Sequence, residues 1–127
     1  KYEGEWKDGE KSGRGKYFYS NGDVYEGDWK NDKRNGVGML VLANGDKYNG
    51  EWIEGQKKGR GTYEFSNGDY YEGYWNGGKR HGTGRYMWRN GESYNGDWRN
   101  DKMNGKGIFY TAVGRTFEGE FKDDKKI

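Results

Sequence analysis

Pairs of basic residues are the first groups in this sequence that could bind a ligand. The set consists of Lys33, Arg34, Lys57, Lys58, Lys79, Arg80 and Lys102. A row of such cations suits the phosphate groups of anionic phospholipids or phosphoinositides. The same segments also contain Asp32, Glu54 and Asp101, so ordinary solvated loops are the alternative interpretation.

Tryptophan and tyrosine are the second group of candidate binding residues. On a sheet face that curves inward, rings left uncovered would form a groove for an amphipathic helix or peptide of a protein partner. The candidate anchors are Trp29, Trp52, Tyr63, Trp75, Tyr86, Trp88 and Trp98. Trp88 stands out because its counterparts at the same spacing vary. The alternative for each ring is packing within the chain.

Catalytic and metal chemistry finds little support in the sequence. There is no cysteine, and the single histidine, His81, has no second histidine with which to hold zinc. The segments 30–36 and 99–105 resemble calcium loops, but lysine occupies the third ligand position and the closing glutamate is absent. No GxGxxG or GxxxxGK[ST] motif occurs. We expect no catalytic site, metal or cofactor.

Composition narrows the class of protein. The chain is 29% hydrophobic and 35% charged, close to a disordered profile, but 18% of its residues are aromatic and fall in register. The net charge of +2 is too small to indicate nucleic acid. No apolar run approaches the roughly 20 residues of a membrane span, and no signal peptide is recognisable. We therefore expect a cytoplasmic protein.

Tyrosine, glycine and tryptophan recur together at a constant interval of 23 residues. The copies are Tyr2/Gly4/Trp6, Tyr25/Gly27/Trp29, Tyr48/Gly50/Trp52, Tyr71/Gly73/Trp75, Tyr94/Gly96/Trp98 and a softer Phe117/Gly119/Phe121. A second glycine pair, such as Gly36/Gly38, and an Asn-Gly pair keep the same step. An unbroken short period indicates a repeat array.

Each repeat predicts two strands. In the first, Tyr25, Gly27 and Trp29 alternate with charged residues, and in the second Gly36, Gly38 and Leu40 share one side. The Asn-Gly pairs predict two-residue type I′ hairpins, whereas the basic pairs fall in longer loops on the opposite edge. The expected fold is all-β, an elongated single-layer meander of about eleven antiparallel strands of some six residues. A closed barrel is the competing architecture.

The glycines within the strands have a physical explanation in such a sheet. An aromatic ring can lie over a glycine on the neighbouring strand and shield both the ring and the backbone from water. Each repeat would then carry its own packing partner.

The unit "YEGDWKNDKRNGVGMLVLANG", residues 25–45, closely resembles the MORN (membrane occupation and recognition nexus) repeat. The resemblance covers the whole chain as one array over residues 1–127, with repeats that begin near 2, 25, 48, 71 and 94 and a partial sixth from 117. In the sixth unit Val113-Gly114-Arg115 replaces Asn-Gly-Asp, which questions its turn geometry.

The resemblance implies a non-enzymatic scaffold that links cytoskeleton, cilium or membrane structures. A peripheral membrane module acting through the basic edge is the alternative. A second alternative is the targeting region of a larger lipid kinase or methyltransferase. Because the chain starts and ends inside repeats, we expect a fragment of a longer array, or end-to-end or homodimer pairing through the open sheet edges.

Overall fold

Alternation of ring and charged side chains produces two strands in every repeat. The computed structural model describes residues 1–127, and its twelve strands form one antiparallel sheet in sequence order. The strands are β1 (Tyr2–Lys7), β2 (Glu10–Phe18), β3 (Val24–Lys30), β4 (Lys33–Val41), β5 (Lys47–Ile53), β6 (Gln56–Glu64), β7 (Tyr70–Asn76), β8 (Lys79–Met87), β9 (Ser93–Arg99), β10 (Lys102–Tyr110), β11 (Thr116–Lys122) and β12 (Lys125–Lys126).

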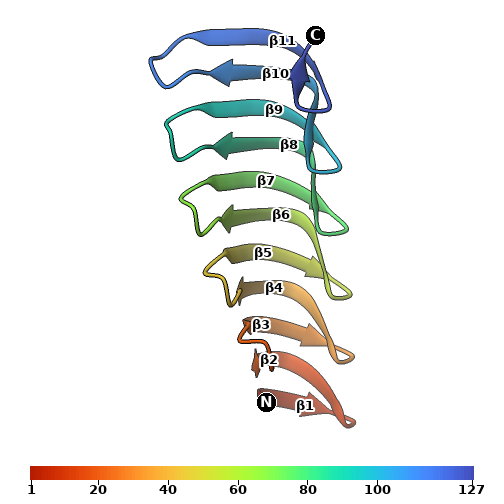
Figure 1. Ribbon diagram of the computed structural model, residues 1–127. Helices are drawn as coiled ribbons and strands as arrows, with labels where there is room; N and C mark the ends of the chain where they lie inside the picture. The colour runs from red at the N-terminus through yellow and green to blue at the C-terminus, as the bar shows by residue number, and fades with distance from the viewer.

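The all-β, single-layer meander expected from the sequence is confirmed. Figure 1 shows an open ladder of hairpins with the two chain ends at opposite ends of the sheet and no other element over either face. The count is twelve strands because Lys125 and Lys126 pair with Lys122 and Phe121. β1 has the six residues expected, but β2 to β11 alternate between nine and seven residues.

In the first five hairpins, a bulge inserts two extra residues into the second strand. In β3 and β4, Gly27 pairs with Gly38 and Trp29 pairs with Arg34, so Asp28 alone faces the segment 35–37. The Asp28 Oδ2 atom accepts the backbone N–H of Val37 at 2.9 Å. A bulge bends the strand that carries it, and the longer strands in Figure 1 curve strongly near the turns at which they begin.

The Asn-Gly loops do not form the expected type I′ turns. Of the loop residues 20–22, only Gly22 has a positive φ, at 99°. The Gly22 N–H donates to the Tyr19 carbonyl at 3.1 Å, and the Tyr19 N–H donates to the Asp23 carbonyl at 2.9 Å. These bonds define a three-residue loop that ends in a left-handed glycine.

Two-residue turns of the type I′ pattern instead occupy the opposite edge, where longer loops were expected. Asn31 and Asp32 have φ angles of 50° and 66° and connect the paired residues Lys30 and Lys33. The other turns of this kind are Asp8-Gly9, Glu54-Gly55, Gly77-Gly78, Asn100-Asp101 and Asp123-Asp124. As a result, the basic pairs belong to the first residues of strands.

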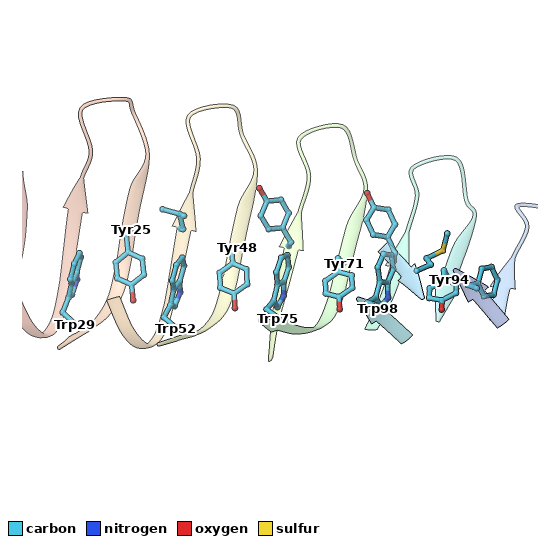
Figure 2. Close-up of a cluster of buried hydrophobic side chains, with 13 residues drawn as sticks. Tyr25, Trp29, Tyr48, Trp52, Tyr71, Trp75, Tyr94 and Trp98 are labelled. Carbon is cyan, nitrogen blue, oxygen red and sulfur yellow. The ribbon is translucent and has the colours of Figure 1, made fainter. Parts of the chain in front are cut away.

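The core is a single row of rings on one face of the sheet. Tyr25 meets Trp29 of its own repeat edge-on at 5.1 Å between ring centroids, and Trp52 of the next repeat at 5.4 Å. The same alternation of tyrosine and tryptophan continues along the array (Figure 2). Such edge-to-face contacts contribute about 0.5–1.5 kcal/mol each beyond the area they bury.

The strand glycines are the positions over which the tyrosines lie, as expected. A Cβ added to Gly38 would overlap the Tyr25 hydroxyl and ring, and one added to Gly27 would overlap the Gly38 backbone. The Tyr25 hydroxyl donates to the Asp28 carbonyl at 2.8 Å, and the Trp29 indole N–H donates to the Gly15 carbonyl at 3.1 Å. Both polar ring atoms are therefore satisfied inside the sheet.

Candidate protein-binding face

The candidate anchor residues lie at different depths on the aromatic face. The side chains of Trp29, Trp52, Trp75 and Trp98 retain only 2–6% exposure, and Tyr63 and Tyr86 are also buried. These six rings belong to the packing of the sheet. Trp88 is half-buried, so it is the only one of the seven candidates with substantial surface open to a partner.

An outer row of apolar side chains covers the buried rings. It consists of the first residue after β2, β4, β6 and β8, namely Tyr19, Leu42, Phe65 and Trp88, all half-buried, whereas Thr111 follows β10. Phe65 packs on Tyr63 at 4.5 Å and on Tyr86 at 5.5 Å between centroids, and Trp88 packs on Tyr86 at 4.6 Å. Only Trp88 of this row was singled out from the sequence. Tyr19, Leu42 and Phe65 are its counterparts at the 23-residue step and were not named as anchors.

The basic set divides between the two faces of the sheet. Because the turns are short and strand residues alternate in direction, Arg34, Lys57 and Arg80 turn toward the rings. The Arg34 guanidinium lies 4.3 Å from the Trp52 centroid, Lys57 Nζ lies 4.9 Å from Trp75, and the Arg80 guanidinium lies 4.8 Å from Trp98. The remaining four, Lys33, Lys58, Lys79 and Lys102, are exposed.

Together these side chains line a groove along the aromatic face. The bend of β6 brings Lys57 near its start and Phe65 just beyond its end to the same hollow, which also includes Tyr63 and Arg80. We call this feature the aromatic groove: Tyr63 and Tyr86 form its floor, Phe65 and Trp88 one wall, and Lys57 and Arg80 the other. Cations over rings on one wall and apolar rings on the other make it amphipathic.

The acidic residues beside the Asn-Gly loops have a structural role. Asp46 Oδ2 accepts the Tyr63 hydroxyl at 2.7 Å, and Oδ1 accepts the Ser66 backbone N–H at 2.7 Å. Asp69 binds Tyr86 and Arg89 in the same way. Burial favours the neutral form of Asp46, but the hydrogen bonds outweigh this effect and lower the pKa of its carboxyl. These carboxylates therefore join each repeat to the next.

The opposite face is charged except near its middle. Val37 and Ile53 are exposed and, with Glu51 and Lys58, line a shallow hollow of about 760 Å³. The residues equivalent to Val37 in the other repeats are Arg14, Arg60, Thr83 and Lys106. This apolar interruption was not expected from the sequence, although the equivalent positions of the repeats reveal it.

The structure adds three observations on other kinds of site. His81 lies within β8. No three histidine, cysteine, aspartate or glutamate side chains are close enough together to hold a metal ion. No helix that could cross a membrane is present.

A model of the MORN repeat matches the chain in six consecutive units: residues 2–24, 25–47, 48–70, 71–93, 94–114 and 117–126. The chain belongs to the MORN repeat family. MORN repeats are generally non-enzymatic interaction modules. No curated protein matches the chain.

The MORN array also has a structural likeness among solved proteins. The TCP domain of SAS-4 (dCPAP) of Drosophila melanogaster, solved in complex with a proline-rich motif of Ana2 (dSTIL), is 16% identical in sequence, with a TM-score of 0.45. The match covers 90% of the MORN array and 74% of that chain.

The last MORN unit keeps the loop geometry that its sequence called into question. Gly114 has a φ of 89°, and its N–H donates to the Thr111 carbonyl at 3.0 Å, as in the other loops. The Thr111 hydroxyl oxygen accepts the Arg115 N–H at 2.9 Å, where an asparagine side chain accepts the corresponding N–H in earlier units. A different side chain thus stabilises the same turn.

Proposed function

We propose that this MORN array is a rigid, non-enzymatic scaffold that binds a protein partner along its aromatic groove. The observation that carries the proposal is the pair of half-buried rings, Phe65 and Trp88, beside cations that already lie over aromatic rings. Aromatic and arginine side chains in well-packed surroundings provide most of the binding energy in protein interfaces. A helix or an extended peptide suits a groove that runs along the sheet.

The buried tryptophans support this proposal indirectly. Trp75 and Trp98 donate their indole N–H groups to backbone carbonyls at 3.1–3.2 Å. Because these two tryptophans pack on the floor rings Tyr63 and Tyr86, the floor of the groove is held rigid before any partner arrives. A preformed surface loses little conformational entropy on binding. The known settings of the MORN family favour a partner in a cytoskeletal, ciliary or membrane-associated structure.

Site-specific photocrosslinking tests the proposal. A photoreactive phenylalanine analogue at position 65 should crosslink a partner in cells, whereas the same analogue at Thr83, exposed on the opposite face, should not. With the identified partner purified, Trp88→Ala should weaken binding by about 2 kcal/mol, and Thr83→Ala should have no effect. Equal crosslinking from both positions, or unchanged binding by Trp88→Ala, would reject the groove as the binding surface.

A second candidate function is contact with an anionic membrane through one long edge of the sheet. Lys33, Lys79, Lys102 and Lys125 share one repeat position at the start of their strands and are all exposed. Each lysine near a charged bilayer contributes about 1 kcal/mol. Lys33, Lys79 and Lys102 changed together to Glu should abolish co-sedimentation with phosphatidylserine vesicles. Negligible pelleting of the unmodified protein would exclude this function.

A further inference from the structure

One position of each repeat places a side chain over the rings, and a turn in the following repeat supplies its polar partner. The side chains are Lys11, Arg34, Lys57, Arg80 and Met103. The opposing turn residues are Asp32, Gly55, Gly78, Asp101 and Asp124, and each donates its N–H to the carbonyl of the corresponding residue at 2.8–3.1 Å. Every cation therefore faces the second residue of a two-residue turn.

Three of the four cations are neutralised or hydrogen-bonded at that turn. The Asp32 carboxylate pairs with Lys11 at 3.5 Å, and the Asp101 carboxylate pairs with Arg80 at 3.1 Å. The Gly55 turn offers only a backbone carbonyl, to which Arg34 donates at 2.9 Å. In two repeats, therefore, a carboxylate on the turn meets the cation on the ring face.

Lys57 is the cation that lacks such a partner. Its turn, Gly77-Gly78, has no side chains, and none of the four ion pairs or the side-chain hydrogen bonds of the structure involves its ammonium group. Three rings surround Nζ, with centroids 4.9–5.5 Å away on Trp75, Tyr63 and Tyr48. Burial lowers the pKa of Lys57, and the more distant Asp101 only partly offsets the effect while Arg34 adds to it.

Space for an incoming group lies directly beside this ammonium. A hollow of about 180 Å³ lies between Lys57 and Arg80 and is also lined by Tyr63, Phe65, Trp75, Gly78 and Asp101. The Asp101 carboxylate is already paired with Arg80. In the repeat that carries Arg80, the equivalent space receives the Asp101 side chain. The glycine turn leaves it open at Lys57.

We infer that Lys57 binds an aspartate or glutamate side chain of the protein partner, which completes the ion pair that Asp32 and Asp101 provide within the chain. This inference rests on the proposed function, because the carboxylate would enter along the aromatic groove. Phe65 and Tyr63 border the hollow and suit the methylene groups of such a side chain, which favours a protein over a phosphate group. A carboxylate strongly stabilises an ammonium group held among rings, because the low local dielectric strengthens the attraction between the two charges.

A double substitution in the Gly77-Gly78 turn would place a carboxylate of the chain itself at the site. Gly77→Asn with Gly78→Asp reproduces the Asn100-Asp101 turn. The backbone accommodates it, since the φ angles are 59° and 84° in the glycine turn and 49° and 71° in the other. A Cβ added to Gly78 lies 4.0 Å from Lys57 Cε, within reach of an ion pair. The matched control is Asp8→Asn with Gly9→Asp, which builds the same turn where no Cβ contact lies within 4 Å.

The first measurement is the pKa of Lys57, obtained from an NMR titration of ¹³C-labelled lysine side chains. The Gly77→Asn/Gly78→Asp variant should raise it relative to the wild type, and the Asp8→Asn/Gly9→Asp control should leave it unchanged. An unchanged pKa of Lys57 in the first variant would show that a carboxylate on this turn does not reach the ammonium, and would overturn the inference.

The second measurement is binding of a labelled peptide with one glutamate between leucines, against its glutamine counterpart. The wild type and the control variant should bind the glutamate peptide at least tenfold more tightly. Lys57→Met and Gly77→Asn/Gly78→Asp should bind both peptides equally. No preference in the wild type, or a preference that persists in these variants, would contradict the inference. A larger shift of the Lys57 signal with inorganic phosphate or phosphatidylserine vesicles than with the peptide would also contradict it.

The two proposals fail in different ways. A partner that crosslinks from position 65 but binds the wild type and Lys57→Met equally would overturn the carboxylate site and leave the aromatic groove intact. Loss of crosslinking from position 65 would overturn both the aromatic groove and the carboxylate site.

Discussion

At the scale of single residues, Asp46 shows how a polar side chain holds the repeats together. Its two oxygens accept one bond from the Tyr63 ring and one from the Ser66 backbone, so it joins one repeat to the next. Asp23 occupies the equivalent position but faces Leu40, which has no hydroxyl, and accepts only the Ala43 N–H from the next repeat. The two residues therefore form a natural comparison for the contribution of the tyrosine bond.

We expect Asp46→Asn to lower the free energy of unfolding by about 1.5–3 kcal/mol at pH 7, because it removes a charged hydrogen-bond acceptor. The folded state lowers the pKa of Asp46. The stabilisation is therefore complete above the ordinary carboxyl pKa of about 4, and it is lost as the pH falls through the lower folded value. Urea unfolding at pH 7 and pH 3 measures both effects. Asp23→Asn is the control, and an equal loss from it would contradict the role assigned to Tyr63.

At the scale of the hairpin, the ring over the glycine pair decides which residues a strand tolerates. The Tyr25 ring occupies the space that a side chain at Gly38 would need. Gly119 holds the equivalent position to Gly27 in the terminal unit, but a Cβ there would meet only the flexible end of Lys126. The same residue type is thus required in the middle of the array and not at its C-terminal end.

We expect Gly38→Ala to destabilise the protein by about 3 kcal/mol or more, because the added methyl group displaces a buried ring. Gly119→Ala should cost less than about 1 kcal/mol. Chemical denaturation of both variants measures the difference. Similar costs would show that backbone flexibility, and not the space below Tyr25, explains the glycine.

The two-residue turns also determine hairpin stability. Glu54 has a φ of 47°, a left-handed conformation that is unfavourable for a residue with a long side chain, and it precedes Gly55. We expect Glu54→Asn to raise the free energy of unfolding by about 0.5–1 kcal/mol, because Asn-Gly is the preferred type I′ sequence. Ala43→Asn, in a loop where only the glycine is left-handed, should bring no gain. A loss of stability in Glu54→Asn, measured by thermal unfolding, would contradict the turn assignment.

At the scale of the whole molecule, each strand pairs only with its neighbours in sequence, and each ring row contact joins a repeat only to the next repeat. A terminal repeat consequently lacks one side of its packing. Trp6 in the first repeat is 58% exposed, whereas Trp52 near the middle is 2% exposed. Stability in such an array is close to a sum of repeat and interface contributions, so it is lowest where an interface is missing.

We expect backbone hydrogen exchange to be slowest in β4–β8 and progressively faster toward β1 and β12. The measurement is mass spectrometry of peptides from each repeat, with equivalent peptides compared directly because their strands have the same register. Uniform protection across all repeats would mean that the sheet opens only as one cooperative unit.

The sequence by itself determined the repeat, the two strands per unit and the face on which the rings lie. These features are local, because alternation in a strand assigns faces and the ring above a glycine needs only its own hairpin. It also identified the pairs of charges, including Lys57, but not the direction in which they point.

The tertiary structure decided the turns and, through them, the site. Asn21 stays out of the left-handed region, since its side-chain oxygen accepts the Asp23 N–H while Asp23 bonds to the next repeat. The expected type I′ turn therefore becomes a three-residue loop. On the other edge, the bulge opposite Asp28 bends β4. The two-residue turn lets this strand begin at Lys33. The combined register places Arg34, Lys57 and Arg80 over the rings, and this depends on bonds between repeats that no single repeat contains.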